Sequence, residues 1–135
     1  MHEQKILDFK AIGDERGYLI SLEENKQIPF EVKRVYYIYG TQKNIIRGKH
    51  AHRKLQQIIF CPKGSCDFTL DNGIERKTIH LNSPAQGIHI KHNIWREFTN
   101  FSPDCIVVVL ASDLYDENDY IRNYDDFLKE VKNNG

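Results

Sequence analysis

The sequence has no excess of either charge and no long apolar run, and each absence excludes a class of protein. Nineteen Lys plus Arg balance nineteen Asp plus Glu, so no global field attracts nucleic acid or anionic lipid. The longest apolar run, residues 106–111, is far shorter than the roughly 20 residues of a membrane-spanning helix. The N-terminus MHEQKILDFK lacks the apolar centre of a signal peptide. We expect a cytoplasmic protein with no nucleic-acid or membrane partner.

Cysteine is scarce as well. The chain has three cysteines, Cys61, Cys66 and Cys105, and no C-x-x-C pair. An odd number without metal-site or redox spacing indicates free thiols and not a disulfide framework. Each cysteine lies in or beside an apolar segment of strand character, so we predict buried, unreactive thiols.

The length and the turn signals predict one all-β domain. The composition, 40% apolar and 28% charged residues over 135 residues, is typical of a globular domain with a real core. No repeat or linker divides the chain, so we expect a single domain over 1–135. Turn signals recur about every ten residues and separate short β-branched and aromatic segments. They lie at 13–17, 62–65, 71–73, 82–84 and 102–104. This spacing predicts a barrel or sandwich.

Two segments give the clearest strands. In residues 66–81, Cys66, Phe68 and Leu70 alternate toward one face and the Asp-Asn-Gly turn at 71–73 returns the chain as a hairpin. Residues 105–112 are apolar on both faces, which predicts a central strand covered on both sides.

The last stretch changes its period. From Glu117 to Lys132, apolar residues recur at three- and four-residue spacing. This pattern predicts an amphipathic C-terminal helix that packs on the barrel. Asp116 or Asn118 is suited to cap its start.

The stretch RGKHAHRK at residues 47–54 contains two histidines, His50 and His52. In a strand they lie on one face, about 6.6 to 7 Å apart, close enough to share a metal ion or a substrate. Two imidazoles alone bind a transition metal weakly, because such sites ordinarily have three or four protein ligands. His89 and His92 are three residues apart and face opposite ways in a strand, so at most one of them can join the pair.

The order G-x-H-x-H, a later glycine and P-x-x-G resembles the two motifs of the cupin superfamily. The matching positions are His50, His52, Gly64 and residues 84–87. The resemblance implies a double-stranded β-helix, or jelly-roll, barrel. Metal-binding cupins add a glutamate and a third histidine, and these positions fall here on Gln56 or Gln57 and near Trp95 and Arg96. Both departures remove ligands, so the resemblance implies no metal.

A closer resemblance is to the sugar nucleotide 3,4-ketoisomerases, which act on dTDP-4-keto-6-deoxy-D-glucose. It rests on five segments in the same order: 14–24 (DERGYLISLEE), 28–38 (IPFEVKRVYYI), 47–57 (RGKHAHRKLQQ), 94–98 (IWREF) and 110–127 (LASDLYDENDYIRNYDDF). The D-x-R-G and R-G-x-H pieces are also similar to 3,5-epimerases of the dTDP-rhamnose pathway. The second histidine and the Y-D-E-x-D-Y-I-R segment favour the ketoisomerases.

This resemblance implies an isomerisation that moves the ketone from C4 to C3 without a metal or an organic cofactor, and supplies a 3-keto sugar to an aminotransferase that makes 3-amino sugars. His50 is then the base at C3, since histidine takes and returns protons near neutral pH. His52 moves a proton between the sugar oxygens or holds the useful tautomer of His50, and the two roles are open to exchange. Tyr36, the inward tyrosine of VYYI, donates to the enolate oxygen.

Four arginines are candidate substrate ligands. Arg34 and Arg47 lie beside Tyr36 and His50 in the sequence, and guanidinium groups suit bidentate phosphate contacts. Arg16 matches an arginine that in the related epimerases reaches the ligand across a dimer interface. The family implies a homodimer with exchanged N-terminal strands. Arg96 cannot act as an ordinary proton donor, which favours a product with an equatorial C4 hydroxyl (gluco), whereas Arg16 matches the galacto-forming type.

Two other functions stay open at this point. The histidine pair is compatible with a metal-dependent cupin oxygenase or isomerase, which stoichiometric metal in the purified protein would indicate. The small size and neutral charge are compatible with a cupin that binds a sugar nucleotide and does not turn it over.

Overall fold

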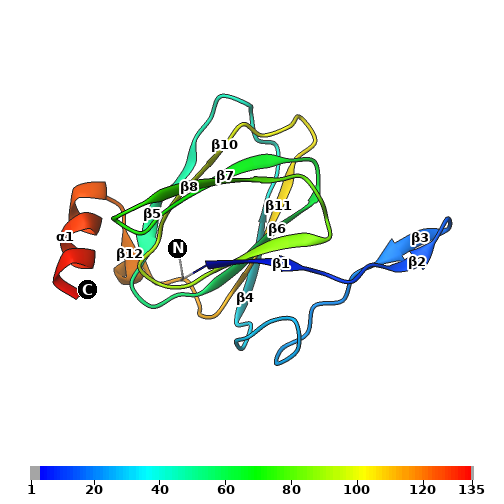
Figure 1. Ribbon diagram of the computed structural model, residues 1–135, viewed down its shortest axis with the longest axis horizontal. Coiled ribbons are helices and arrows are strands. Elements are labelled where there is room, and N and C mark those ends of the chain that lie inside the picture. The colour runs from blue at the N-terminus through cyan, green and yellow to red at the C-terminus, as the bar shows by residue number, and fades with distance from the viewer. Residues whose placement is uncertain (1–3, 135) are drawn as a thin grey trace.

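The computed structural model describes residues 4–134; residues 1–3 and 135, the ends of the expected domain, lie outside that range. Two five-stranded antiparallel sheets face each other and enclose the core (Figure 1). The first sheet has the order β1 (Gln4–Asp8), β9 (Gln86–Ile90), β6 (Gln57–Lys63), β11 (Ile106–Ala111), β4 (Arg34–Ile38). The second has the order β12 (Tyr120–Ile121), β5 (Arg47–His52), β10 (Trp95–Thr99), β7 (Cys66–Asp71), β8 (Arg76–Leu81). The all-β jelly-roll prediction is confirmed.

The alternation of side chains along the strands explains the core. On β11, Val107 and Val109 point between the sheets, whereas Val108 and Leu110 pack on the outer face of the first sheet. Phe9, Ile28 and Phe30 cover that outer face. The predicted strand at 105–112 is therefore covered on both sides, as its two-sided apolar pattern indicated.

The predicted hairpin at 66–81 is confirmed. β7 pairs with β8 from Cys66 opposite Leu81 to Asp71 opposite Arg76. Cys66, Phe68 and Leu70 are fully buried, and the turn contains Gly73 at φ 92°. The Asp71 carboxylate accepts a hydrogen bond of 2.7 Å from the Gly73 N–H, which fixes the turn.

The predicted start of the C-terminal helix at Glu117 is wrong. The helix α1 runs over Tyr124–Asn134, and the Asn123 side chain accepts from the Asp126 N–H in its first turn. Residues 117–119 form a short 3-10 helix that Asp116 caps, and Tyr120–Ile121 form β12, which pairs with β5. Strand pairing with the histidine strand has overridden the helical period here. The helix packs on the barrel through Phe127, as expected.

The N-terminal region has one strand in the barrel and a hairpin outside it. β1 pairs with β9 of its own chain, after which β2 (Ile12–Asp14) and β3 (Gly17–Leu19) form a hairpin that projects from the barrel (Figure 1). Tyr18 is 73% exposed on this hairpin. Within residues 4–134, no helix has the length and apolar character needed to cross a membrane.

Candidate active site

One mouth of the barrel contains an open pocket of about 290 Å³. Its walls come from both sheets: Arg34, Tyr36 and Ile38 of β4, Arg47, Gly48 and His50 of β5, Phe98 of β10, Tyr120 of β12, and Arg122. The structure thus brings together four of the seven residues expected from the sequence. The other three, His52, Arg96 and Arg16, do not line the pocket.

The backbone of β5 fixes the tautomer of His50. Gly48 has φ 85° and Lys49 has φ 54°, at a bulge where the register with β10 shifts. Glycine is strongly favoured at residue 48, because φ is positive there and a Cβ would lie 3.0 Å from both the Arg96 carbonyl oxygen and the Phe98 ring. The bulge places the Gly48 carbonyl 3.0 Å from His50 Nδ1. A carbonyl only accepts, so neutral His50 carries its proton on Nδ1 and leaves the Nε2 lone pair free.

Both histidines are neutral at physiological pH. Burial, and then the positive charge of Arg96, lower the pKa of His50 to about 4. The same two causes, in the same order, lower the pKa of His52 further. The rings meet edge to face with centroids 4.8 Å apart, and Tyr120 contacts both. A neutral imidazole beside an open pocket is able to accept a proton without first losing one.

His52 lies behind His50, fully buried, beside one carboxylate. Its Nδ1 is 3.4 Å from Asp119 Oδ2, although the geometry does not make a hydrogen bond. The backbone N–H groups of Lys54 and Leu55 donate to the Asp119 carboxylate at 2.8 and 3.2 Å. Asp119 is thus held in place by the main chain, so that a proton on His52 Nδ1 would face a fixed negative charge.

Tyr36 is oriented by a chain of side-chain hydrogen bonds. Arg96 Nη1 donates to Gln57 Oε1, and a guanidinium has no acceptor, so the Gln57 amide must turn its Nε2 toward Tyr36. Gln57 Nε2 donates to the Tyr36 hydroxyl at 3.0 Å. The hydroxyl proton of Tyr36 is therefore free for another acceptor. Burial raises the pKa of Tyr36, which keeps the phenol protonated.

Arg96 is buried beneath the pocket and does not line it. Its Nη2 donates to the Ile94 carbonyl at 3.0 Å, and the residue as a whole is 1% exposed. Burial lowers its pKa to about 10, so the guanidinium stays charged at neutral pH. The expected direct contact of Arg96 with substrate stays a prediction. What its position does provide is a fixed cation behind Tyr36 and the two histidines.

The residues present do not fit a metal centre at the histidine pair. Of Gln56 and Gln57, the two candidates for the position of the cupin glutamate, Gln57 faces the site, and its oxygen already accepts from Arg96. The buried guanidinium acts electrostatically on both imidazoles and would repel a cation there. Within the described residues, one group of three potential metal-binding side chains is close enough to share an ion. It consists of three cysteines and does not include His50 or His52. His89 faces away, with Nε2 2.9 Å from Gln56 Oε1 and its ring against Phe30.

The pocket rim is cationic although the chain is neutral. The Arg34 guanidinium lies over the Tyr36 ring at 5.0 Å, and Arg47 lines the same wall. Arg122, 4.1 Å above the Tyr120 ring, adds a third cation and pairs with Glu117. Arg16 does not line this pocket: it lies in the turn of the β2–β3 hairpin, which projects from the barrel (Figure 1), and is exposed and paired with Asp14 at 2.6 Å.

Sequence reasoning missed three residues of the site: Asp119, Tyr120 and Arg122. They belong to the Y-D-E-x-D-Y-I-R segment, which a helical period had assigned to the C-terminal helix. The alternation of Tyr120 and Arg122 across buried Ile121 is the strand signal that could have found them.

The fold and pocket define a cupin-type barrel with a pocket lined by histidine, tyrosine and arginine side chains in one mouth. A family model described as "FdtA: WxcM-like, C-terminal" matches residues 2–132. A TDP-4-oxo-6-deoxy-alpha-D-glucose-3,4-oxoisomerase of Aneurinibacillus thermoaerophilus is 51% identical over 129 residues, 96% of this chain and 93% of that protein.

Two solved structures are also similar. The TDP-quinovose 3,4-ketoisomerase WlaRB of Campylobacter jejuni is 51% identical with a TM-score of 0.92, covering 96% of this chain and 99% of its own. A histidine-to-asparagine mutant of the 3,4-ketoisomerase QdtA of Thermoanaerobacterium thermosaccharolyticum, in complex with TDP-4-keto-6-deoxyglucose, is 43% identical with a TM-score of 0.96, covering 98% and 96%. The chain belongs to the WxcM-like family of sugar nucleotide 3,4-ketoisomerases, and the resemblance seen in its sequence is confirmed.

Proposed function

We propose that this protein converts TDP-4-keto-6-deoxy-D-glucose to a TDP-3-keto-6-deoxyhexose by acid–base chemistry without a metal or an organic cofactor. The observation that carries the proposal is the pair of groups on one pocket: His50, neutral with a free Nε2, and Tyr36, protonated with a free hydroxyl hydrogen. These are the base and the proton donor that an enediol reaction requires.

The C4 ketone makes the hydrogen on C3 acidic, and His50 Nε2 removes it as a proton. The C3–H electrons form a C3=C4 double bond, and the ketone electrons move to O4, which Tyr36 stabilises by donating its hydrogen bond. O4 takes up a proton to give the enediol, the O3 hydroxyl then loses its proton, C3 becomes the ketone and C4 receives a proton. Two protons leave, from C3 and O3, and two arrive, at C4 and O4, so no redox partner is needed.

His52 acts through His50 in this proposal. It does not line the pocket, and its ring meets the His50 ring edge to face. Asp119 supplies a negative charge at 3.4 Å from His52 Nδ1 that would stabilise a transient imidazolium. We therefore place His52 and Asp119 as positioning residues behind the base, and His50 at the substrate.

The diphosphate binds at the rim. Arg34, Arg47 and Arg122 converge on the pocket of a chain with zero net charge, so the positive charge is local to this mouth. Guanidinium groups match phosphate oxygens in pairs. The rim arginines thus orient the sugar so that its ring enters between His50 and Tyr36.

We propose a homodimer formed through the N-terminal region. The β2–β3 hairpin exposes Ile12, Tyr18 and Leu19 to solvent, at 58%, 73% and 60%. An arm of this length with three large apolar side chains is stabilised by a second subunit. Arg16 on this hairpin would then reach the partner's pocket. Light scattering tests the assembly, and a monomer contradicts it.

The product is proposed to have the gluco configuration at C4. WlaRB is named a TDP-quinovose 3,4-ketoisomerase, and quinovose is 6-deoxyglucose. Buried Arg96 supplies no titratable proton near neutral pH, in keeping with this configuration. The H4–H5 coupling in a proton NMR spectrum, read after trapping with an aminotransferase, distinguishes an equatorial from an axial hydroxyl.

The activity is tested by incubation of the protein with TDP-4-keto-6-deoxyglucose in deuterated water. We expect deuterium at C4 of a new 3-keto product, and at C3 of the 4-keto sugar that the reverse reaction forms again. Tight nucleotide binding without exchange would instead identify a binding cupin, and loss of activity on metal removal would identify a metal enzyme.

We also propose a cytoplasmic location. We propose a 3-amino sugar pathway, because a 3-ketone is the group that an aminotransferase consumes.

A further inference from the structure

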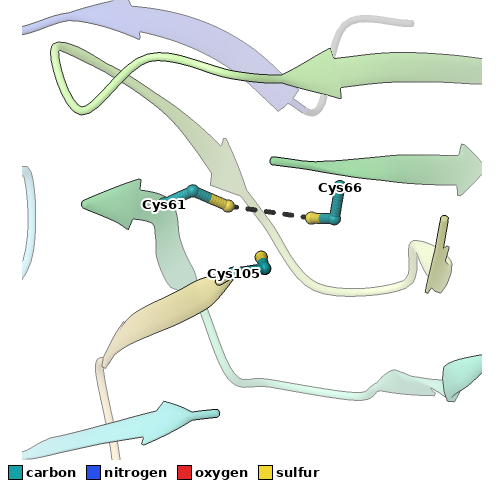
Figure 2. A group of neighbouring side chains, drawn as sticks. All are labelled: Cys61, Cys66 and Cys105. Carbon is teal, nitrogen blue, oxygen red and sulfur yellow. Dashed lines mark hydrogen bonds between the residues drawn. The ribbon is translucent and has the colours of Figure 1, made fainter. Parts of the chain in front are cut away.

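A second chemical cluster lies in the barrel interior away from the pocket. Cys61, Cys66 and Cys105 are free, 0%, 0% and 3% exposed, and their sulfur atoms all lie within 4.8 Å of one another. Figure 2 shows the three side chains directed toward a common centre. The Cys61 and Cys66 sulfurs are 3.7 Å apart. These three are all the cysteines in the chain.

The backbone holds the three thiols together. Cys61 lies near the end of β6 and Cys66 begins β7, and the short connection at 64–65 crosses from one sheet to the other. Ser65 and Ser102 exchange hydrogen bonds of 2.9 Å and attach this turn to the loop before Cys105. Gly64, at φ 74°, permits the approach, since a Cβ there would lie 2.6 Å from the Cys105 Cα. The cluster is thus fixed by the main chain.

The spacing matches the coordination of one thiophilic atom. With a metal–sulfur bond of about 2.3 Å, two sulfurs on one centre lie about 3.8 to 4 Å apart. The Cys61 and Cys66 sulfurs are already at 3.7 Å, and the Cys105 sulfur lies within 4.8 Å of both. Among residues 4–134, the group supplies three ligands and no fourth histidine or carboxylate. Zinc ordinarily requires four protein ligands in a closed site, so three sulfurs in an apolar interior favour a three-coordinate centre.

Charge selects among three-coordinate centres. A monovalent copper ion on three thiolates leaves two net negative charges, and a zinc ion leaves one, in a core built from apolar side chains such as Phe68, Leu81 and Phe101. Trivalent arsenic gives a neutral product. Arsenous acid loses three hydroxyl groups, three S–H bonds break, three As–S bonds form and three waters leave, with arsenic trivalent throughout.

We propose that Cys61, Cys66 and Cys105 form a three-sulfur binding site for trivalent arsenic at the closed end of the barrel. Native mass spectrometry with sodium arsenite tests it. The expected adduct carries one arsenic and lacks three hydrogens. A centre held by two sulfurs would retain a hydroxyl group, and its adduct would be heavier by one water. That heavier adduct in the wild-type protein, or no adduct on the folded protein, overturns the proposal.

Cys105→Ser provides the matched variant. It should form the heavier, hydroxyl-retaining adduct and bind arsenite at least tenfold more weakly, because one sulfur is lost. Cys105→Ala gives the same comparison if serine disturbs the core, and an unchanged thermal unfolding temperature shows that either variant is folded.

We also expect the folded chain to bind arsenite at least tenfold more tightly than the urea-unfolded chain. Equal affinities, or preferred uptake of copper or zinc by the folded chain, would overturn the proposal. Since no cysteine lines the pocket, these readouts are independent of ketoisomerase activity.

Discussion

The two ends of the barrel are built from the same strands and differ sharply in chemistry. On β6, inward-facing Gln57 lies in the hydrogen-bond chain of the site, Ile59 fills the middle, and Cys61 lies in the closed end. Four residues of strand, about 13 Å, separate the polar mouth from the apolar closed end. The comparison shows how a small barrel supports an active site. Buried polar groups at one end lower the free energy of unfolding, and apolar packing at the other end offsets that loss.

Unpartnered polar atoms show this division. Among the described residues, five buried side-chain atoms lack a hydrogen-bond partner: Arg34 Nε, Thr41 Oγ1, His52 Nδ1 and Nε2, and Arg96 Nε. All but the threonine belong to the site. Each such atom costs about 1–3 kcal/mol, which a fold tolerates where function requires the group.

The most severe way to break the polar end is His50→Asn. Asparagine keeps a polar group of similar size and cannot act as a base near neutral pH, so we expect kcat to fall by about 10³-fold or more. Steady-state kinetics with TDP-4-keto-6-deoxyglucose measures this. The matched control is His80→Asn, a change at an exposed histidine paired with Asp67, which should leave kcat within twofold. A His50→Asn rate near wild type would remove His50 from the role of base.

The corresponding test of the closed end is Leu81→Ala. Leu81 is 1% exposed in the main core, so the lost contacts and the cavity should lower the free energy of unfolding by about 2–5 kcal/mol. Urea unfolding followed by circular dichroism measures it. Ile74→Ala, at a side chain that is 93% exposed, should change stability by less than about 0.5 kcal/mol. We expect kcat of Leu81→Ala to be retained at temperatures where it is folded, and a selective loss of kcat would show that the two ends are not separate.

The sequence predicted the closed end and the strand-borne part of the mouth. Alternation in the 66–81 hairpin and the two-sided pattern at 105–112 indicated the core directly, and the i, i+2 spacing placed His50 and His52 on one face. Sequence reasoning failed at Asp119 and Tyr120, because a two-residue strand leaves almost no periodicity and its pairing with β5 is a long-range contact. It also could not show that Arg96 faces Gln57 beneath the pocket, since burial of a charge depends on neighbours from other strands.

A titration separates the two ends without any mutation. Because the folded-state pKa of His50 is about 4 and the unfolded value is about 6.5, the unfolded chain binds a proton first as the pH falls. The stability due to neutral His50 is complete above pH 6.5 and is lost between about 6.5 and 4, by at most about 1.4 kcal/mol per pH unit.

His52, with its pKa also lowered, adds a loss in the same direction over the same range. Urea unfolding at pH 7, 6, 5 and 4.5 should therefore show a smaller slope for His50→Asn than for the wild type. Equal slopes would mean that His50 is not held neutral by its surroundings. Catalysis, which requires neutral His50, should persist at pH 5 in the wild type.

The smallest effect expected is that of Asp119→Asn, which sharpens the division of labour within the polar end. The amide oxygen can take the place of Oδ1 and keep the 2.8 Å hydrogen bond from the Lys54 N–H, whereas the longer bond from the Leu55 N–H to Oδ2 is lost. The loop thus keeps its shorter main-chain contact while the charge beside His52 is removed. We expect kcat to fall roughly tenfold with KM unchanged, because a transient proton on His52 loses its stabilising partner. Asp113→Asn, at an exposed carboxylate of the preceding loop, is the control and should have no effect.

A structural role of Asp119 alone would lower stability and leave the pH dependence of kcat as it was. A role in stabilising a proton on His52 predicts that the acid limb of the pH–kcat profile shifts. An unshifted profile with unchanged kcat would show that His52 does not depend on Asp119.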